Sequence, residues 1–196
     1  MVPTTEELLH ALTRTVTTLT GTGIRFAVAG GCAVYARGGP VTHHDVDIFV
    51  KPEDTDAAVA ALAEEGLRLC EPAEDWLTKV YDGDTLIDVI FRPNNRDVTD
   101  ELLDRAEEMR IGPTMAPVVS GTDLMVDKLL VFDAHRLDLS PLLHIARDLR
   151  EQVDWTAVRQ QTEHSPYARA FLGLLADLGI ADTGITNGGT DTEGGK

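Results

Sequence analysis

The sequence predicts an α+β fold, in which a mixed sheet flanked by helices is followed by a bundle of helices. Two observations support this prediction. Up to about residue 120, short apolar segments typical of strands alternate with amphipathic segments of helical spacing. From residue 121 onward, the chain has a helical pattern throughout. With 196 residues, of which 43% are hydrophobic, the chain is long enough for a core domain with a helical extension.

The first part of the chain supplies the first strands and the helices beside them. Residues 4–20 are predicted to form a helix that Thr4 or Thr5 caps and that Gly21 and Gly23 end. The elements expected next are a strand at 24–30, a helix at 31–38, a strand at 45–50 and a helix at 52–66. The last of these helices begins with acidic residues, which the helix dipole favours at that end.

Shorter strands and later helices complete the predicted fold. Strands are expected at 67–70, 76–82, 84–91 and 114–120, a helix at 100–108, and four further helices at 121–134, 139–150, 154–162 and 166–179. A hairpin turn is predicted at Asp82-Gly83-Asp84. We accordingly divide the chain into a core at 1–120, a helical region at 121–182 and a tail at 183–196. The tail has little to bury and is expected to be disordered.

The charge of the chain limits its partners. There are 33 acidic and 17 basic residues, for a formal net charge of −16. This balance disfavours non-specific binding to long DNA, which depends on basic contacts to phosphate. It is compatible with a metal-bound nucleotide, because the ion supplies positive charge, and with a short RNA end held by a local basic patch. No apolar run approaches the ~20 residues needed to cross a bilayer, and the N-terminus lacks a signal-peptide pattern, so we expect no membrane partner and a cytoplasmic location.

Several side chains outside the motifs have structural interpretations. Aromatic side chains bury large apolar areas, so we expect Trp76, Phe91, Trp155 and Phe171 to fill the core. Arginines recur along the late helices and could form a local patch for RNA or nucleotide. We favour a solvated face for them, because charged helix positions most often lie in solvent. These arginines are Arg147, Arg150, Arg159 and Arg169.

Three carboxylates lie in apolar strand segments. Asp45 and Asp47 are two residues apart, so both point to one face, with Cα atoms ~6–7 Å apart. Asp88 is an isolated acid in a second apolar strand. Burying a carboxylate is costly unless it is paired or bound to metal. If the two strands are neighbours, the three carboxylates converge on a site suited to magnesium and phosphate oxygens. The alternative is that Asp45 and Asp47 form a solvated strand end.

A double glycine precedes these carboxylates. Gly30 and Gly31 end a strand and open a helix, where glycine permits close backbone approach and free N–H groups attract phosphate. A triphosphate could then lie between these amides and a metal ion held by Asp45 and Asp47. The alternative is that the two glycines simply make a turn.

Two histidines stand next to the first carboxylate. Zinc requires three or four well-spaced ligands, and the side chains of adjacent residues in a strand point to opposite sides. His43 and His44 therefore do not predict a zinc site with Asp45. A position near the phosphates is the more plausible role for one of them, and we assign it to His44.

The order strand, Gly-Gly, helix, Asp-x-Asp strand and later strand Asp resembles the core pattern of the nucleotidyltransferase superfamily. The resemblance covers roughly residues 24–160 and is greatest to the small bacterial branch that contains the AbiEii and MenT toxins of toxin–antitoxin systems. In that branch a helix carries a lysine and is followed by a basic residue and an aspartate. The matching residues are Lys128, then His135-Arg136, then Asp138.

The resemblance implies a fold, a reaction and a set of roles. A nucleoside monophosphate would pass from an NTP to an acceptor hydroxyl, and Asp45, Asp47 and Asp88 would hold Mg²⁺ or Mn²⁺. Asp88 would also help to deprotonate the acceptor or would hold a second metal ion, and Lys128 would offset phosphate charge. The branch implies a toxin that acts on the 3′ end of tRNA and is neutralised by an antitoxin protein. A small molecule or a protein is the rival acceptor, and a non-catalytic nucleotide-binding module is the rival class.

The chain departs from the family pattern at two places. Many relatives have Ser or Thr two residues before the first Asp, where this chain has His43. Either Thr42, one residue further away, makes the phosphate contact, or the loop is arranged differently. Leu137 stands where a basic residue often precedes the later Asp. Asp138 is expected near the nucleotide, with helix capping or a salt bridge as an equal alternative. Lys128 has the alternative of a surface lysine.

Overall fold

Seven strands form one mixed sheet, in the order β3-β4-β5-β2-β1-β7-β6. The computed structural model describes residues 3–42, 44–70 and 74–184, and the strands are counted within these ranges. Their bounds are β1 Phe26–Val28, β2 Val46–Val50, β3 Arg68–Cys70, β4 Leu77–Asp82, β5 Thr85–Ile90, β6 Glu107–Ile111 and β7 Thr114–Val118. Because β2 is parallel to β5 but antiparallel to β1, the predicted mixed sheet is confirmed.

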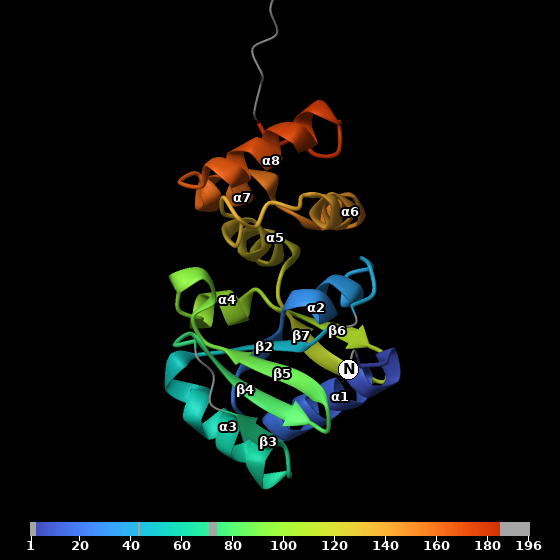
Figure 1. Cartoon of the computed structure of the whole chain (residues 1–196), viewed down its shortest axis with the longest axis vertical. Helices are drawn as coiled ribbons and strands as arrows, with labels where there is room; N and C mark the ends of the chain where they lie inside the picture. The colour runs from blue at the N-terminus through green and yellow to red at the C-terminus, as the bar shows by residue number, and fades with distance from the viewer. Residues whose placement is uncertain (1–2, 43, 71–73, 185–196) are drawn as a thin grey trace, which may run out of the picture.

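Helices cover both faces of this sheet (Figure 1). Their bounds are α1 Thr5–Thr22, α2 Gly30–Ala36, α3 Thr55–Glu64, α4 Asp100–Asp104, α5 Gly121–Leu130, α6 Ser140–Leu149, α7 Trp155–Thr162 and α8 Pro166–Asp177, with 3₁₀ turns η1 Pro52–Asp54, η2 Pro93–Asn95 and η3 Arg150–Gln152. α1 and α3 pack against the lower face in Figure 1, whereas α2 and α5 lie above the sheet. Among the described residues, no helix has the length and apolar character that crossing a bilayer requires.

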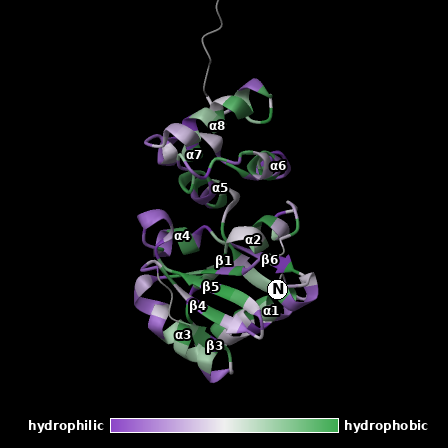
Figure 2. Cartoon of the chain, viewed as in Figure 1, coloured by the Kyte–Doolittle hydropathy of each residue, from purple (hydrophilic) through white to green (hydrophobic). Residues whose placement is uncertain are grey.

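The central strands are apolar because both of their faces are covered. Val46 and Ile48 of β2, and Ile87 and Val89 of β5, are fully buried. Figure 2 shows the strands as mainly hydrophobic, while the outer sides of the helices carry hydrophilic residues. Strands covered on both faces have nearly continuous apolar sequences. A carboxylate in such a strand therefore stands out as energetically costly.

Two local signals have the predicted effect. Thr4 caps α1, because its hydroxyl accepts a hydrogen bond from the Glu7 N–H and the Glu7 carboxylate accepts one from the Thr4 N–H. The hairpin turn joins β4 to β5 with Asp82 paired to Thr85. Gly83 in this turn has φ +61°, a conformation that favours glycine.

The sequence prediction is wrong for residues 100–108. The helix there ends at Asp104, and β6 begins at Glu107 and forms a hairpin with β7. Glu107 and Glu108 resemble the end of an acidic helix, but they lie exposed on the edge strand of the sheet. Charged residues are common on edge strands. Residues 107–111 therefore pair with β7 although their local sequence pattern is helical.

The chain is helical after β7, and α5 contacts α6, α7 and α8 (Figure 1). The four predicted helices are present, although α5 ends at Leu130 rather than at residue 134. The predicted tail starts too early, because Thr183 is fully buried and its hydroxyl donates to the Leu172 carbonyl at 3.3 Å. Residues 185–196 of that predicted tail lie outside the described residues.

One buried arginine links the helical region to the sheet. The guanidinium of Arg37, at the end of α2, donates to the Val119 carbonyl at 2.7 Å, the Gln152 side chain at 3.2 Å and the Glu107 carboxylate at 3.1 Å. The Gln152 side chain donates back to the Arg37 carbonyl at 2.9 Å. Sequence reasoning did not single out Arg37. Its contacts join α2, β6, the end of β7 and η3.

We expect the Arg37→Leu variant to be destabilised by roughly 3 kcal/mol, because it leaves buried hydrogen-bonding groups without partners. Urea unfolding followed by circular dichroism measures this change. The control is Arg147→Leu, which alters an exposed arginine on α6 and should change stability by about 0.5 kcal/mol or less. Equal stability of the two variants would show that the Arg37 contacts do not hold these elements together.

Candidate active site

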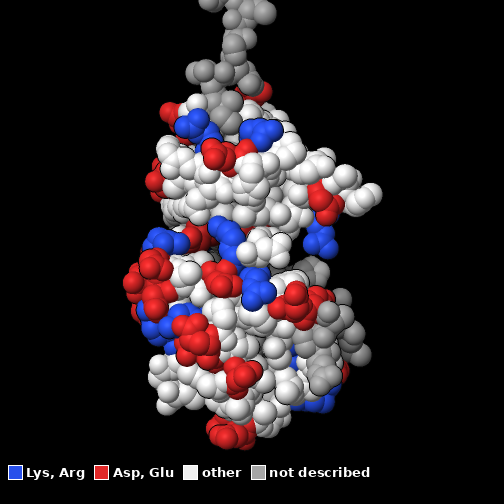
Figure 3. Space-filling model, turned by 90° about the vertical axis from the view of Figure 1, so that its left-hand side faces the viewer, with Lys and Arg blue, Asp and Glu red and all other residues white. Residues whose placement is uncertain are grey.

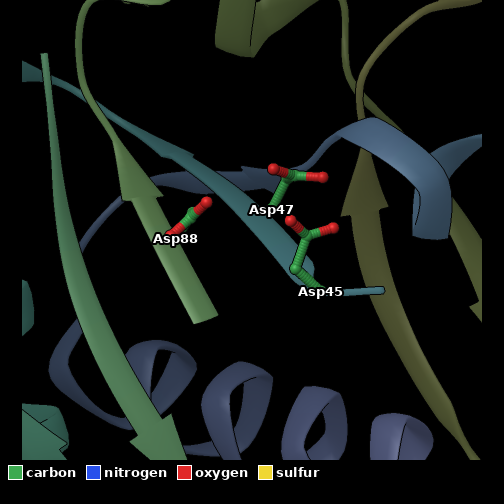
Figure 4. Close-up of side chains that lie close together, drawn as sticks. All are labelled: Asp45, Asp47 and Asp88. Atoms are coloured by element: carbon green, nitrogen blue, oxygen red, sulfur yellow. The ribbon is translucent and has the colours of Figure 1, made fainter. Parts of the chain in front are cut away.

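Three carboxylates meet at the centre of the sheet (Figure 4). Asp45 directly precedes β2, Asp47 lies in β2 and Asp88 lies in β5. β2 and β5 are parallel neighbours, and Asp47 and Asp88 are register partners. One carboxylate oxygen from each of the three residues lies within 4.8 Å of the others. The neighbouring strands therefore produce the convergence that the sequence predicted.

Burial and neighbouring carboxylates raise the pKa values of Asp47 and Asp88. Burial, followed by the charges of Asp45 and Asp88, raises the pKa of Asp47 to about 7, against the opposing effect of Lys128. Burial and the charge of Asp45 raise the pKa of Asp88 to about 6, with Lys79 acting in the other direction. The buried Oδ1 of Asp88 has no hydrogen-bond partner among the residues that the structure describes. A divalent cation is the kind of ligand that this arrangement of charge accommodates.

These pKa values predict that metal-free protein loses stability as the pH rises. A carboxyl group whose folded pKa is raised holds its proton more tightly in the folded state than in the unfolded chain. The stability contributed by Asp47 and Asp88 is therefore fully present below their ordinary pKa of 3.8 and is lost as the pH passes through about 6 to 7. Urea unfolding in EDTA at pH 5 and pH 8 measures the decrease.

A variant and a metal titration control this pH prediction. Asp47→Asn removes one of the two groups, so its free energy of unfolding should fall less between pH 5 and pH 8 than that of the wild type. Mn²⁺ should restore the stability of the wild type at pH 8, because the cation offsets the repulsion. An identical pH dependence in wild type and variant would contradict the assigned pKa of Asp47.

The double glycine makes room for two of the site's side chains. Gly30 has φ +54°, and a Cβ placed on it would lie 1.7 Å from Asp47 Oδ2. A Cβ on Gly31 would lie 2.4 Å from Thr42 Oγ1. The Gly31 N–H donates to the Asp47 carboxylate and thereby lowers its pKa. In this structure the glycines thus hold Asp47 and Thr42 close to the start of α2.

Lys128 reaches the same place from α5. Burial lowers its pKa, while Asp47, Asp127 and Asp45 act to raise it. Lys128 lines a pocket of about 450 Å³, which extends from Asp47 between the sheet, the η2 turn and α5. The lining residues are Gly30, Asp47, Phe49, Trp76, Ile90, Pro93, Asn94, Asn95, Leu124, Asp127, Lys128, Val131 and Arg136. The lysine is therefore half-buried beside the carboxylates and is not a simple surface residue.

The structure does not bring all the predicted residues into the pocket. His44 is exposed beside Asp45 and does not line the pocket, and His43 lies outside the described residues. Asp138 is exposed, and its carboxylate accepts the Ser140 N–H at 3.0 Å. That contact lies in the turn that leads into α6, whose N-cap residue is Leu139 and for which no side-chain cap hydrogen bond is found among the described residues, so the role of Asp138 stays a prediction.

Sequence reasoning missed part of the pocket wall. The prediction that Trp76 fills the core is wrong, because its side chain is 37% exposed and lines the pocket, whereas Trp155 and Phe171 are buried as predicted. Asp127 was also missed. Its Oδ1 accepts from Arg96 at 2.6 Å and from Asn94 at 3.3 Å. The Pro-Asn-Asn sequence after β5 could have indicated the η2 turn that forms this wall, because Asn tolerates the left-handed conformation that the turn requires.

Comparisons with known proteins define the class of the protein. A family model described as "Uncharacterised nucleotidyltransferase" matches residues 4–177, so the chain belongs to this nucleotidyltransferase family. A search of curated proteins finds no match. The narrower assignment to the AbiEii and MenT branch stays a prediction.

Solved structures with the same fold support this classification. ANT(2″)-Ia in complex with adenylyl-2″-tobramycin is 16% identical, with a TM-score of 0.58 over 85% of this chain and 97% of that one. The lincosamide antibiotic adenylyltransferase LnuA, with lincomycin bound, is 15% identical, with a TM-score of 0.52 over 78% and 100%. An antigenic nucleotidyltransferase-like protein from Paracoccidioides brasiliensis is 14% identical, with a TM-score of 0.58 over 91% of each chain. At these identities the similarity shows a shared fold.

Proposed function

We propose that the protein transfers a nucleoside monophosphate from an NTP to a hydroxyl group of a small-molecule acceptor. The observation that carries this proposal is the cluster of Asp45, Asp47 and Asp88 oxygens within 4.8 Å, with Lys128 beside it. In the proposed division of labour, residues 1–120 supply the carboxylates and glycines, and residues 121–182 supply Lys128.

The cluster fits a divalent cation. Three carboxylates from two neighbouring strands offer oxygen ligands, and the unpartnered Oδ1 of Asp88 is a buried acceptor that a cation would satisfy. Asp45, Asp47 and Asp88 would hold Mg²⁺ or Mn²⁺. When bound, the ion would supply positive charge next to the α-phosphate.

The chain's own residues would orient the reactants. The Lys128 ammonium would bind phosphate oxygens, and Thr42 with the backbone at Gly30 and Gly31 would position the rest of the triphosphate. The acceptor oxygen would attack the α-phosphorus, and the bond from that phosphorus to the oxygen bridging the β-phosphate would break. Pyrophosphate leaves, and Asp88 takes the proton of the acceptor hydroxyl.

A small acceptor is better supported than tRNA. The net charge is −16, and Figure 3 shows acidic and basic side chains interspersed on the visible face. Binding of RNA phosphates generally needs a basic surface. Two proteins of the same fold are described with small antibiotics: ANT(2″)-Ia in complex with adenylyl-2″-tobramycin, and LnuA with lincomycin bound. Transfer to the tRNA 3′ end, with a cognate antitoxin, is the rival that the sequence resemblance suggests. Dependence on NTP fits the expected cytoplasmic location.

The test uses NTPs labelled at the α- or the γ-phosphate. The purified protein is incubated with each of the four NTPs, Mg²⁺ or Mn²⁺, and either total tRNA or a panel of aminoglycosides, lincosamides and other hydroxylated small molecules. We expect label from the α-phosphate alone to enter a small molecule, and Asp45→Asn to prevent it. Labelled tRNA would support the toxin instead, and no transfer to any acceptor would favour a non-catalytic nucleotide-binding module.

A further inference from the structure

The pocket extends beyond the groups that the proposed reaction uses. From Asp47 and Lys128 it continues to Trp76 and to the η2 turn, which contributes Asn94 and Asn95. Its volume of about 450 Å³ lies within the range of small-ligand sites. Because one end of the pocket is formed by Asp47 of the carboxylate cluster and by Lys128, we expect its occupant to be attached to the reacting phosphate or to attack it.

The walls of this pocket are mainly apolar, and its charged lining residues are Asp47, Asp127, Lys128 and Arg136. Apolar or aromatic side chains come from β2, β5, η2 and α5, namely Phe49, Ile90, Pro93, Leu124 and Val131. Apart from Asp47, the lining carboxylate is Asp127, which already accepts hydrogen bonds from the side chains of Arg96 and Asn94. A polycationic acceptor would need free carboxylates here. An uncharged planar ring is better matched to these walls.

Trp76 and Asn95 provide suitable contacts for such a ring. Trp76 is 37% exposed and lines the pocket, and its carbonyl accepts the N–H groups of Phe91 and Arg92, just before η2. Asn95 is exposed with φ +59°. In the described part of the chain, neither the indole N–H nor the Asn95 amide has a hydrogen-bond partner. Asn94 fixes the turn by donating to the Asp127 carbonyl at 3.2 Å.

We propose that this pocket binds the nucleoside of the NTP, with Trp76 stacking on the base and Asn95 contacting its polar edge. Stacking on an aromatic side chain accepts any base, so the Asn95 amide would supply the preference among bases. This inference rests on the proposed function and deepens it, because it names Trp76 and Asn95 as the residues that recognise the donor nucleotide.

Tryptophan fluorescence tests the stacking directly, because the chain contains only Trp76 and Trp155. In a Trp155→Phe background, Trp76 is the only tryptophan, and excitation at wavelengths that tyrosine does not absorb reports on it alone. We expect an NTP with Mg²⁺ to quench its emission, whereas inorganic tripolyphosphate with Mg²⁺ does not, since it has the phosphates without a base. Equal quenching by both, or no quenching by a bound NTP, would overturn the proposal.

Equilibrium binding provides the second measurement. Trp76→Ala should weaken NTP binding about tenfold or more while leaving tripolyphosphate binding unchanged. Asn95→Ala should reduce the differences in affinity among the four NTPs. The matched control is Tyr35→Ala, which removes an equally exposed aromatic side chain that does not line the pocket.

These measurements separate the two proposals. Unchanged NTP affinity in Trp76→Ala, with weaker binding of the acceptor, would assign the pocket to the acceptor and overturn the nucleoside assignment alone. Base-dependent binding at Trp76 without any nucleotidyl transfer would support the pocket and contradict the proposed reaction.

Discussion

Replacement of Asp47 by asparagine is expected to reduce nucleotidyl transfer by roughly 1000-fold, because a catalytic metal ion contributes several kcal/mol to lowering the barrier. Asp47 is central to the cluster: it pairs in register with Asp88 and lies beside Gly30. Burial, and then repulsion from the other two carboxylates, raises its pKa to about 7. Removing one negative charge should leave the metal-free fold as stable as the wild type or more stable.

The Asp47→Asn variant therefore separates function from folding. Steady-state transfer rates, together with the rise in melting temperature on adding Mn²⁺, measure the two effects, and both should be lost in the variant. Asp56→Asn, which alters an exposed carboxylate on α3, should behave like the wild type. Full activity in the Asp47→Asn protein would exclude a role for this carboxylate in the reaction.

Replacement of Gly30 by alanine should reduce transfer about 100-fold by displacing the Asp47 carboxylate. The added Cβ would lie 1.7 Å from Asp47 Oδ2, and φ +54° is unfavourable for alanine. The positive φ alone costs about 1 kcal/mol, so the protein should remain folded while the carboxylate shifts. Misplacement of a reacting group by about 1 Å can cost about 100-fold in rate.

Gly21→Ala is the matched control for Gly30→Ala. Gly21 lies in α1, and a Cβ at this position meets no atom within 4 Å. Alanine favours helix over glycine, so this variant should be equally active and slightly more stable. Both variants are compared by kcat, KM and urea unfolding. If Gly30→Ala kept the wild-type kcat, the site would not require close approach of backbone and carboxylate.

The sequence carried enough information to place the carboxylate cluster. Asp45, Asp47 and Asp88 stand out because they lie in apolar strand segments. Burying a carboxylate costs so much free energy that it is unusual without a ligand or partner. The parallel pairing of β2 with β5 then brings them together. The glycine pair was also recognisable, although its contact with Asp47 was visible only in the folded chain.

Features that depend on a distant partner could not be predicted. β6 looks helical until β7 pairs with it, and Arg37 looks like an ordinary surface residue until its contacts with Val119 and Gln152 are seen. Trp76 looks like a core residue because aromatic side chains usually are. Its place in the pocket depends on where α5 packs, some 50 residues later in the chain.

The most direct test of the central claim is a crystal structure with Mn²⁺ and a non-hydrolysable NTP, in which anomalous scattering locates the metal. We expect a manganese peak within coordination distance of the carboxylates of Asp45, Asp47 and Asp88, with the triphosphate between that ion and Lys128. Nucleotide bound elsewhere, or a cluster that stays free of manganese at saturating concentrations, would contradict the assignment of these three carboxylates as the site of nucleotidyl transfer.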